Sequence, residues 1–304
     1  GYKGKPKLAL NYHKEALAID EKLGKEQYLP GHLLNIGNIY VDMGAYKKAL
    51  SNFKKALGAY EKSNDLVGMI NSLNSIAIVY YDQGNYPLSI EYHNKSLDIA
   101  QSAKDTIGMF QAIINIGNIH RQEGFPDKAI SFYNKAEKLN TIEANIPVLK
   151  NNIAGVYYDK EKFDIAILYF KESIEVCRKT DNDIYLAQAL NGLGFAYSET
   201  KKYDDALKCF EEANKINLLN NQFDLMYSYH CMADIYYAID KYDLALINAQ
   251  KMAQLSDENG FLMHQKNAYA LLSKIYKKTG DYLKALESHE KYKVLHDSIF
   301  NKEN

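Results

Sequence analysis

The segment Leu34-Asn35-Ile36-Gly37-Asn38-Ile39-Tyr40 returns eighty residues later as Ile114-Asn115-Ile116-Gly117-Asn118-Ile119-His120. A Gly-x-Tyr triplet begins at Gly44 and recurs in the same register at Gly84 and Gly280. Self-similarity at a fixed spacing is the signature of a repeat protein. The chain is therefore built from units of about 40 residues.

One position marks the turn inside each unit. Its eight occurrences are Gly4, Gly44, Gly84, Gly124, Glu161, Lys201, Asp240 and Gly280. Successive members lie 37 to 40 residues apart and together account for all 304 residues. We therefore predict one all-α solenoid over residues 1–304, with about seven and a half helix pairs. Because three turns hold Glu161, Lys201 or Asp240 in place of Gly, we expect those turns to differ.

Each unit is predicted to contain two helices, which we call A and B. In the second unit, helix A covers about 32–43 and helix B about 46–61, with apolar residues at helical spacing. The residues that recur are small or aromatic, and they suit close packing between helices. The small set in helix B comprises Ala9, Ala49, Ser89, Ala129, Ala166, Ala206, Ala245 and Ala285. The repeated aromatic positions account for 26 Tyr beside no Trp.

Composition excludes several classes of protein. Lys and Arg number 37 against 38 Asp and Glu, a balance that argues against a nucleic-acid surface. No apolar run is long enough to cross a membrane. The three cysteines cannot form a disulfide framework. No His-Glu-x-x-His, Cys-x-x-Cys or Gly-x-Ser-x-Gly motif occurs, so we expect neither an enzyme nor a cofactor site within these residues.

The recurring residues resemble the tetratricopeptide repeat. In the second unit they are Gly37, Tyr40, Gly44, Tyr46, Ala49, Phe53 and Ala56. The resemblance covers nearly the whole chain, although the period is about 40 and the common period of the family is 34. It implies a right-handed superhelix that binds a protein or an extended peptide in a groove lined by the A helices. A basic carboxylate clamp is not expected, because its Lys and Arg positions are not matched.

The two ends suggest a longer protein. The first unit lacks its helix A, as though a natural array had been cut. Residues 291–304 are expected to form a C-terminal helix that leads to a downstream module, and 291–300 resemble the tail of repeat domains in bacterial membrane-anchored sensors. That resemblance implies the sensory region of a histidine kinase or related regulator, on the periplasmic side of a membrane. A cytoplasmic location is the alternative.

Polar and aromatic residues recur on the stripe of helix A that faces the groove in the family. Asn is a poor choice for a helix interior, so its repetition there needs an explanation. Its carboxamides can pair with the backbone of an extended peptide, and Tyr and Arg add contact area and a carboxylate partner. Alternatively, the Asn side chains bond to neighbouring helices. The candidates are Asn35, Asn38, Asn74, Tyr81, Asn115, Asn118, Arg121, Asn151, Tyr158, Asn191, Asp234 and Tyr237.

Two further functions stay open beside the groove receptor. The first unit exposes an apolar helix B with Leu8, Leu10 and Leu17, which could pair with a second copy in a scaffold or homodimer. A soluble quorum-peptide receptor is the other alternative, because its relatives also have long repeats with Asn on the A helices. His230 and Asp234 are spaced as a local helix pair or a weak metal site. No nucleic acid and no direct membrane contact are expected within these residues.

Overall fold

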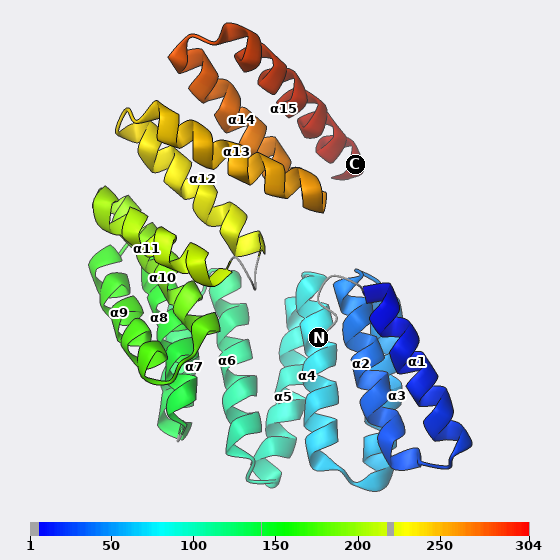
Figure 1. Ribbon diagram of the computed structural model, residues 1–304. Coiled ribbons are helices and arrows are strands. Elements are labelled where there is room, and N and C mark those ends of the chain that lie inside the picture. The colour runs from blue at the N-terminus through cyan, green and yellow to red at the C-terminus, as the bar shows by residue number, and fades with distance from the viewer. Residues whose placement is uncertain (1–5, 141, 218–221, 304) are drawn as a thin grey trace. The chain divides into compact units, whose positions relative to one another are not determined.

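The fold is an all-α solenoid made of consecutive antiparallel helix pairs. Figure 1 shows the computed structural model of the chain. The structure describes residues 6–140, 142–217 and 222–303. These residues form fifteen α-helices and two short 3-10 helices, and they contain no β-strand. None of the described helices is both long and apolar enough to span a bilayer. The predicted fold class is therefore confirmed.

The chain divides into two compact units, Gly1–Ile142 and Glu143–Asn304. A single continuous superhelix over 1–304 stays a prediction. Unit 1 contains α1 (Pro6–Lys22), η1 (Glu26–Tyr28), α2 (Leu29–Asp42), α3 (Tyr46–Ser63), α4 (Leu66–Asp82), α5 (Tyr86–Ser102), α6 (Thr106–Gln122) and α7 (Pro126–Leu139). The A helices of unit 1 are α2, α4 and α6.

Unit 2 continues the same alternation, and its A helices are α8, α10, α12 and α14. Its elements are η2 (Glu143–Asn145), α8 (Ile146–Asp159), α9 (Phe163–Lys179), α10 (Asp183–Glu199), α11 (Tyr203–Asn217), α12 (Gln222–Ala238), α13 (Tyr242–Asn259), α14 (Leu262–Thr279) and α15 (Tyr282–Glu303). In both units the first complete helix A follows a 3-10 turn and has a buried Pro in its first turn, Pro30 in α2 and Pro147 in α8. A missing N–H costs nothing at that place in a helix.

The turns between helices A and B share one backbone geometry. Gly44, Gly84, Gly124 and Gly280 have φ of 68° to 85°. Glu161, Lys201 and Asp240 have φ of 57° to 59°. In each case the amide of the following residue, three residues beyond the helix end, donates to a Tyr carbonyl of that helix at 2.8–2.9 Å, as it does after α2. The expectation that these three turns differ is therefore wrong. The ends of the two helices impose a left-handed backbone conformation at this position, and a residue other than Gly adopts it with some strain. The turn expected at Gly4 lies outside the described residues.

The predicted packing residues close the interface between helices A and B. Ala49, Phe53 and Ala56 of α3 are fully buried. A Cβ added at Gly37 of α2 would lie 2.3 Å from the Phe53 ring, so only glycine allows the two helices this approach. Gly117 meets Tyr133 and Gly194 meets Phe210 in the same way. Most of the small residues of helix B are thus confirmed as core, whereas most Tyr residues of the repeat are partly exposed and Tyr282 is 71% exposed.

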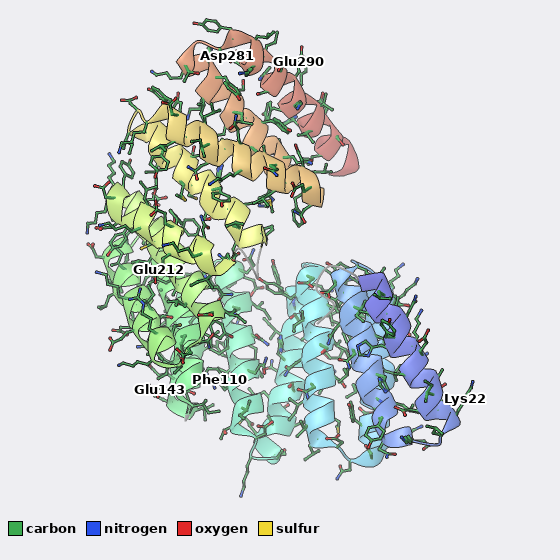
Figure 2. All side chains as sticks on the ribbon, viewed as in Figure 1. Lys22, Phe110, Glu143, Glu212, Asp281 and Glu290 are labelled. Carbon is green, nitrogen blue, oxygen red and sulfur yellow. The ribbon has the colours of Figure 1, made fainter. Side chains whose placement is uncertain are left out.

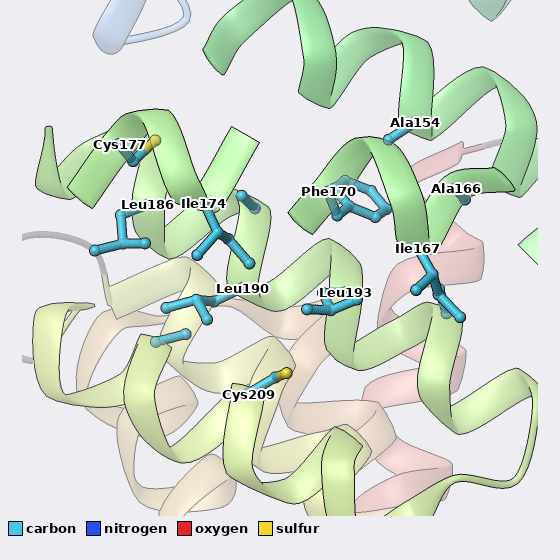
Figure 3. Close-up of a cluster of buried hydrophobic side chains, with 13 residues drawn as sticks. Ala154, Ala166, Ile167, Phe170, Ile174, Cys177, Leu186, Leu190, Leu193 and Cys209 are labelled. Carbon is cyan, nitrogen blue, oxygen red and sulfur yellow. The ribbon is translucent and has the colours of Figure 1, made fainter. Parts of the chain in front are cut away.

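The core of unit 2 includes two free thiols, Cys177 and Cys209 (Figure 3). Both pack among aliphatic side chains of α9, α10 and α11, including Ile174 and Leu190. Burial raises the pKa of Cys209 to about 11, with Glu212 and Asp205 adding to the effect. These cysteines act as small apolar core residues.

Candidate functional site

In unit 1 the predicted stripe lies partly open on α2, α4 and α6. Asn35 and Asn38 are exposed on α2, and Asn115 is half-buried on α6. Ile78 of α4 occupies the position equivalent to Asn38 and is 44% exposed. The exposed side chains provide amide donors and acceptors beside apolar surface. This arrangement is suited to an extended backbone.

Other predicted Asn residues of unit 1 hold helices together. Asn74 is 8% exposed, and its Oδ1 lies 3.0 Å from Nδ1 of the buried His93 on α5. Asn118 accepts a hydrogen bond of 2.7 Å from the Tyr133 hydroxyl of α7. Burial lowers the pKa of His93 to about 4, so the ring stays neutral and donates to the carboxamide oxygen. For Asn74 the structure supports the alternative of an interhelical bond.

Tyr81 and Arg121 bring an aromatic and a cationic group to the C-terminal ends of α4 and α6. The Tyr81 ring lies 5.6 Å from the Tyr86 ring, centre to centre. Burial, Tyr86 and Asp82 raise the pKa of Tyr81, and the nearby Arg121 opposes that rise. The two predicted residues are therefore within electrostatic reach of each other across adjacent repeats. We call Asn35, Asn38, Ile78, Tyr81 and Arg121 the unit 1 face.

The A helices of unit 2 bring different side chains together. Tyr158 of α8 donates a hydrogen bond of 3.3 Å to Oε1 of Glu199 on α10. The Phe195 ring of α10 meets the Tyr227 ring of α12 edge to face, with centres 5.4 Å apart. Asp234 follows two turns after Tyr227 on α12 and is exposed. We call Tyr158, Phe195, Glu199, Tyr227 and Asp234 the unit 2 face.

The unit 2 face has a negative electrostatic environment. Burial raises the pKa of Tyr158 to about 12, and Glu199, Cys231 and Tyr227 add to the effect. Burial likewise raises the pKa of Cys231 to about 12, with Asp234 and Glu199 as further causes. Both carboxylates therefore act on the same half-buried thiol on α12. The Tyr158 hydroxyl and the Cys231 thiol stay protonated at neutral pH.

The predicted Asn residues of unit 2 are mostly removed from solvent. Asn151 donates from Nδ2 to the Tyr185 carbonyl of α10 at 3.3 Å and is half-buried. Asn191 is only 7% exposed. The amides of Asn151 and Asn191 are therefore less accessible than the exposed Asn35 and Asn38 of unit 1.

His230, Asp234 and Tyr237 complete the predicted candidates on α12. His230 Nε2 lies 3.5 Å from Asp234 Oδ2, and the Lys274 ammonium lies 4.3 Å from the centre of the Tyr237 ring. Within the described part of the chain, no group of three His, Cys, Asp or Glu side chains could hold a metal ion. His230 and Asp234 are therefore a local helix pair.

One further row of exposed side chains was not predicted from the sequence. Each long A helix carries an exposed apolar residue in its first turn, on the same stripe as the predicted candidates. The row comprises Val67, Ile107, Ile184, Phe223 and Met263, which are 46% to 67% exposed. The repeat period could have predicted this row. The period of about 40 residues exceeds the common 34 by about six, so each helix is longer and its exposed face extends by part of a turn.

Unit 2 also has a hollow of about 600 Å³ between helices α9 and α11, over α10. Its charged side chains pair with one another: Arg178 Nη2 donates to Oε1 of Glu212 at 2.7 Å, and Lys179 pairs with Glu175 at 2.8 Å. Glu212 on α11 is marked in Figure 2. Lys171, which also lines the hollow, lies over the Tyr197 ring at 5.7 Å from its centre.

Comparison with known families identifies the repeat. The tetratricopeptide repeat matches residues 68–141 and 145–216, and a second form of the same repeat matches residues 33–63. These matches cover more than half of the chain. The chain belongs to the tetratricopeptide repeat family, as the sequence resemblance predicted.

A curated relative and two solved structures extend the comparison. Outer dynein arm-docking complex subunit 4 of Xenopus laevis is 25% identical over 142 residues, which are 47% of this chain and 26% of that protein. The chain thus spans about a quarter of that relative's length. The apo quorum sensor NprR from B. thuringiensis is 16% identical with a TM-score of 0.72, covering 96% of this chain and 83% of that one.

The second structure is a Rap protein complexed with competence and sporulation factor. It is 14% identical with a TM-score of 0.62, and the match covers 99% of this chain and 88% of that one. At such low identity both structural likenesses show the fold alone.

Proposed function

We propose that this chain is a non-catalytic recognition domain that binds an extended peptide or protein segment on the open faces of its A helices. The observation that carries the proposal is that packing and exposure are separated by position. On α2, Gly37 packs against Phe53 in the core, whereas Asn35 and Asn38 are exposed. On α4, Ile76 is fully buried, whereas Ile78 is exposed. Exposed amides beside apolar surface suit a peptide backbone.

The structural neighbours support a peptide as the ligand. One is a quorum sensor, and another is a Rap protein solved with competence and sporulation factor. Both match nearly the full length of this chain. We further propose a sensory role in a bacterial signalling protein of the histidine kinase type, supported by the resemblance of residues 291–300 to the tail of such sensors. Ligand binding would then act by favouring one arrangement of α15 over another.

Hydrogen exchange with a pooled library of extended peptides tests the recognition role. We expect slower exchange in peptides that cover 32–42 and 113–122 of unit 1, or 151–159 and 188–199 of unit 2. Replacing Asn38 by Ala should reduce protection on the unit 1 face. Asn134→Ala, a matched change of an exposed residue on helix α7, should leave it unchanged. Absence of protection on every A helix would contradict the proposal.

Self-association is a second candidate function, and exposed apolar residues on α1 favour it. Leu8 and Tyr12 are 40% and 49% exposed, and Ile19 is exposed further along the same helix. Of the residues predicted for this patch, Leu10 is buried and Leu17 packs against the core. Such a patch can pair with a second copy. Light scattering over a concentration series tests this role: growth in mass that Ile19→Ser abolishes supports a scaffold, and a constant monomer mass contradicts it.

A further inference from the structure

The unit 2 face combines aromatic rings with unmatched negative charge. Tyr158, Phe195 and Tyr227 come from three successive A helices, α8, α10 and α12. The Phe195 and Tyr227 rings touch edge to face, and the Tyr158 hydroxyl bonds to Glu199. The Tyr158 ring also meets Phe163, and the Phe195 ring also packs on the buried Phe210, so neighbouring helices hold both rings in place. Aromatic faces attract cations, most strongly where water is displaced.

The charged side chains of the three helices that carry these rings are mostly acidic. Helices α10 and α12 contain four acidic residues and neither Lys nor Arg. Lys150 of α8 is engaged elsewhere, at 2.9 Å from Glu172 of α9, and Lys274 of α14 lies against Tyr237. Among the described residues, no Lys or Arg lies within ion-pair distance of Glu199. Asp234 is matched only by His230, at 3.5 Å.

Cys231 lies near the same two carboxylates. The thiol is half-buried on α12, one turn after Tyr227. Asp234 and Glu199 both add to the rise of its pKa. Two carboxylates from different helices therefore converge on one point beside the aromatic rings. Convergent charge of one sign selects a ligand of the opposite sign.

We propose that Tyr158, Phe195, Glu199, Tyr227 and Asp234 form a subsite for a cationic side chain, Lys or Arg, of the bound peptide segment. The rings enclose the aliphatic stem and the charged head, and the two carboxylates pair with the head. The Tyr158–Glu199 hydrogen bond holds one carboxylate in place for this contact. This inference rests on the proposed recognition function and names the chemistry of its ligand.

Four peptide pools test the subsite. Each pool holds acetylated, amidated heptapeptides with a fixed central Arg, Lys, citrulline or Glu and random flanking residues without Cys. Citrulline keeps the shape of Arg without its charge. We expect the Arg and Lys pools to bind about tenfold more tightly than the citrulline pool in fluorescence anisotropy. Hydrogen exchange should slow in segments 154–160, 193–200 and 226–236.

Variants locate the preference on named groups. Glu199→Gln and Asp234→Asn should each reduce the preference for Arg over citrulline to less than threefold. Glu175→Gln removes an exposed carboxylate from α9 and should leave the preference intact. Glu199→Lys should reverse the charge preference of the subsite, so that the Glu pool binds better than the Arg pool. Tyr227→Leu keeps the apolar surface, removes the aromatic face and should weaken the Arg pool about threefold.

The outcomes separate this inference from the function on which it rests. Equal binding of the Arg and citrulline pools, with protection on the A helices, overturns the cation subsite and leaves the recognition role standing. A charge preference with protection only in other segments also overturns the subsite. No protection on any A helix overturns both. Because the Glu199 and Asp234 side chains are exposed, their substitution leaves the fold intact, and circular dichroism verifies this.

Discussion

The faces of the two units differ while their packing does not. The unit 1 face carries amides, Ile78 and the cation Arg121, whereas the unit 2 face carries aromatic rings and carboxylates. Beneath both faces, a small residue on helix A meets an aromatic ring on helix B, as Gly37 meets Phe53 and Gly194 meets Phe210. The repeat thus fixes the residues that join helices and leaves the exposed stripe free to vary.

The largest expected effect tests whether the shared core is equivalent in the two units. Phe53 and Phe210 are both fully buried at the same repeat position. We expect Phe53→Ala and Phe210→Ala each to lower the free energy of unfolding by about 3–5 kcal/mol, because each leaves a cavity. Urea denaturation measures the loss. The control Leu168→Ala, at a 56% exposed residue, should cost far less. Very unequal losses for the two Phe variants would break the comparison.

Hydrogen exchange on the same two Phe variants shows whether each loss of stability stays within its own unit. In repeat arrays stability is mostly a nearest-neighbour property. We expect Phe53→Ala to speed exchange mainly in α2–α5, and Phe210→Ala mainly in α10–α13. Uniform acceleration over both units would contradict local stability.

The next effect is a pH dependence of stability that we expect in unit 1 because of His93. His93 in unit 1 takes the helix B slot that Phe170 and Phe210 hold in unit 2. Its pKa is about 4 when folded and 6.5 as a free group, so the unfolded chain binds the proton more readily. Stability should therefore fall by about 3 kcal/mol as pH drops from 6.5 to 4.

The control for that effect comes from the protein itself. Tyr133 occupies the His93 slot in the next repeat and donates to Asn118. We expect His93→Tyr to remove most of the loss between pH 6.5 and 4, measured by urea denaturation at each pH. An unchanged pH dependence in this variant would assign the acid sensitivity to other groups.

A smaller effect tests the close helix approach in unit 1. Gly37→Ala should destabilise the protein by about 1–3 kcal/mol, because the new Cβ would overlap the Phe53 ring. Gly58→Ala is the matched control on α3, where a Cβ meets no atom within 4 Å. It should stabilise the helix by about 0.5–1 kcal/mol. Thermal unfolding measures whether each variant is less or more stable than the parent protein. A Gly37→Ala variant of unchanged stability would refute the packing argument.

The smallest effect concerns the turns. Unit 1 uses Gly84 where unit 2 uses Lys201, both with positive φ. Lys201→Gly should raise the free energy of unfolding by about 0.5–1 kcal/mol, and Gly84→Ala should lower it by about 1 kcal/mol. Opposite signs in denaturation experiments support equal turn geometry in both units. A destabilising Lys201→Gly would show that the Lys side chain contributes contacts of its own.

The sequence predicted the fold through its repetition. The spacing of Gly44, Gly84 and Gly124 set the period, and the small and aromatic slots placed the core, which Phe53 and Ala49 confirm. The turn at Lys201 could not be predicted in the same way. There the residue type gives no sign of a left-handed backbone, and the flanking helices impose it.

The candidate sites were predicted less well, because periodicity gives the face of a helix and not its neighbours. Asn38 and Asn74 lie on one predicted stripe, yet the first is exposed and the second bonds to His93. The pairing of Phe195 with Tyr227 depends on how far α12 is shifted along α10, which one helix's sequence does not encode. Contacts across helices therefore needed the structure.

The lengthened A helices also set a scale for what they can hold. A helix of 17 residues, such as α4 or α10, is about 25 Å long. An extended strand rises about 3.3 Å per residue, so about seven or eight residues would run its length. The exposed apolar residues in the first turns of these helices, Val67 in α4 and Ile184 in α10, provide apolar contact area at one end of that length. The length of one A helix thus corresponds to an extended peptide of about seven or eight residues.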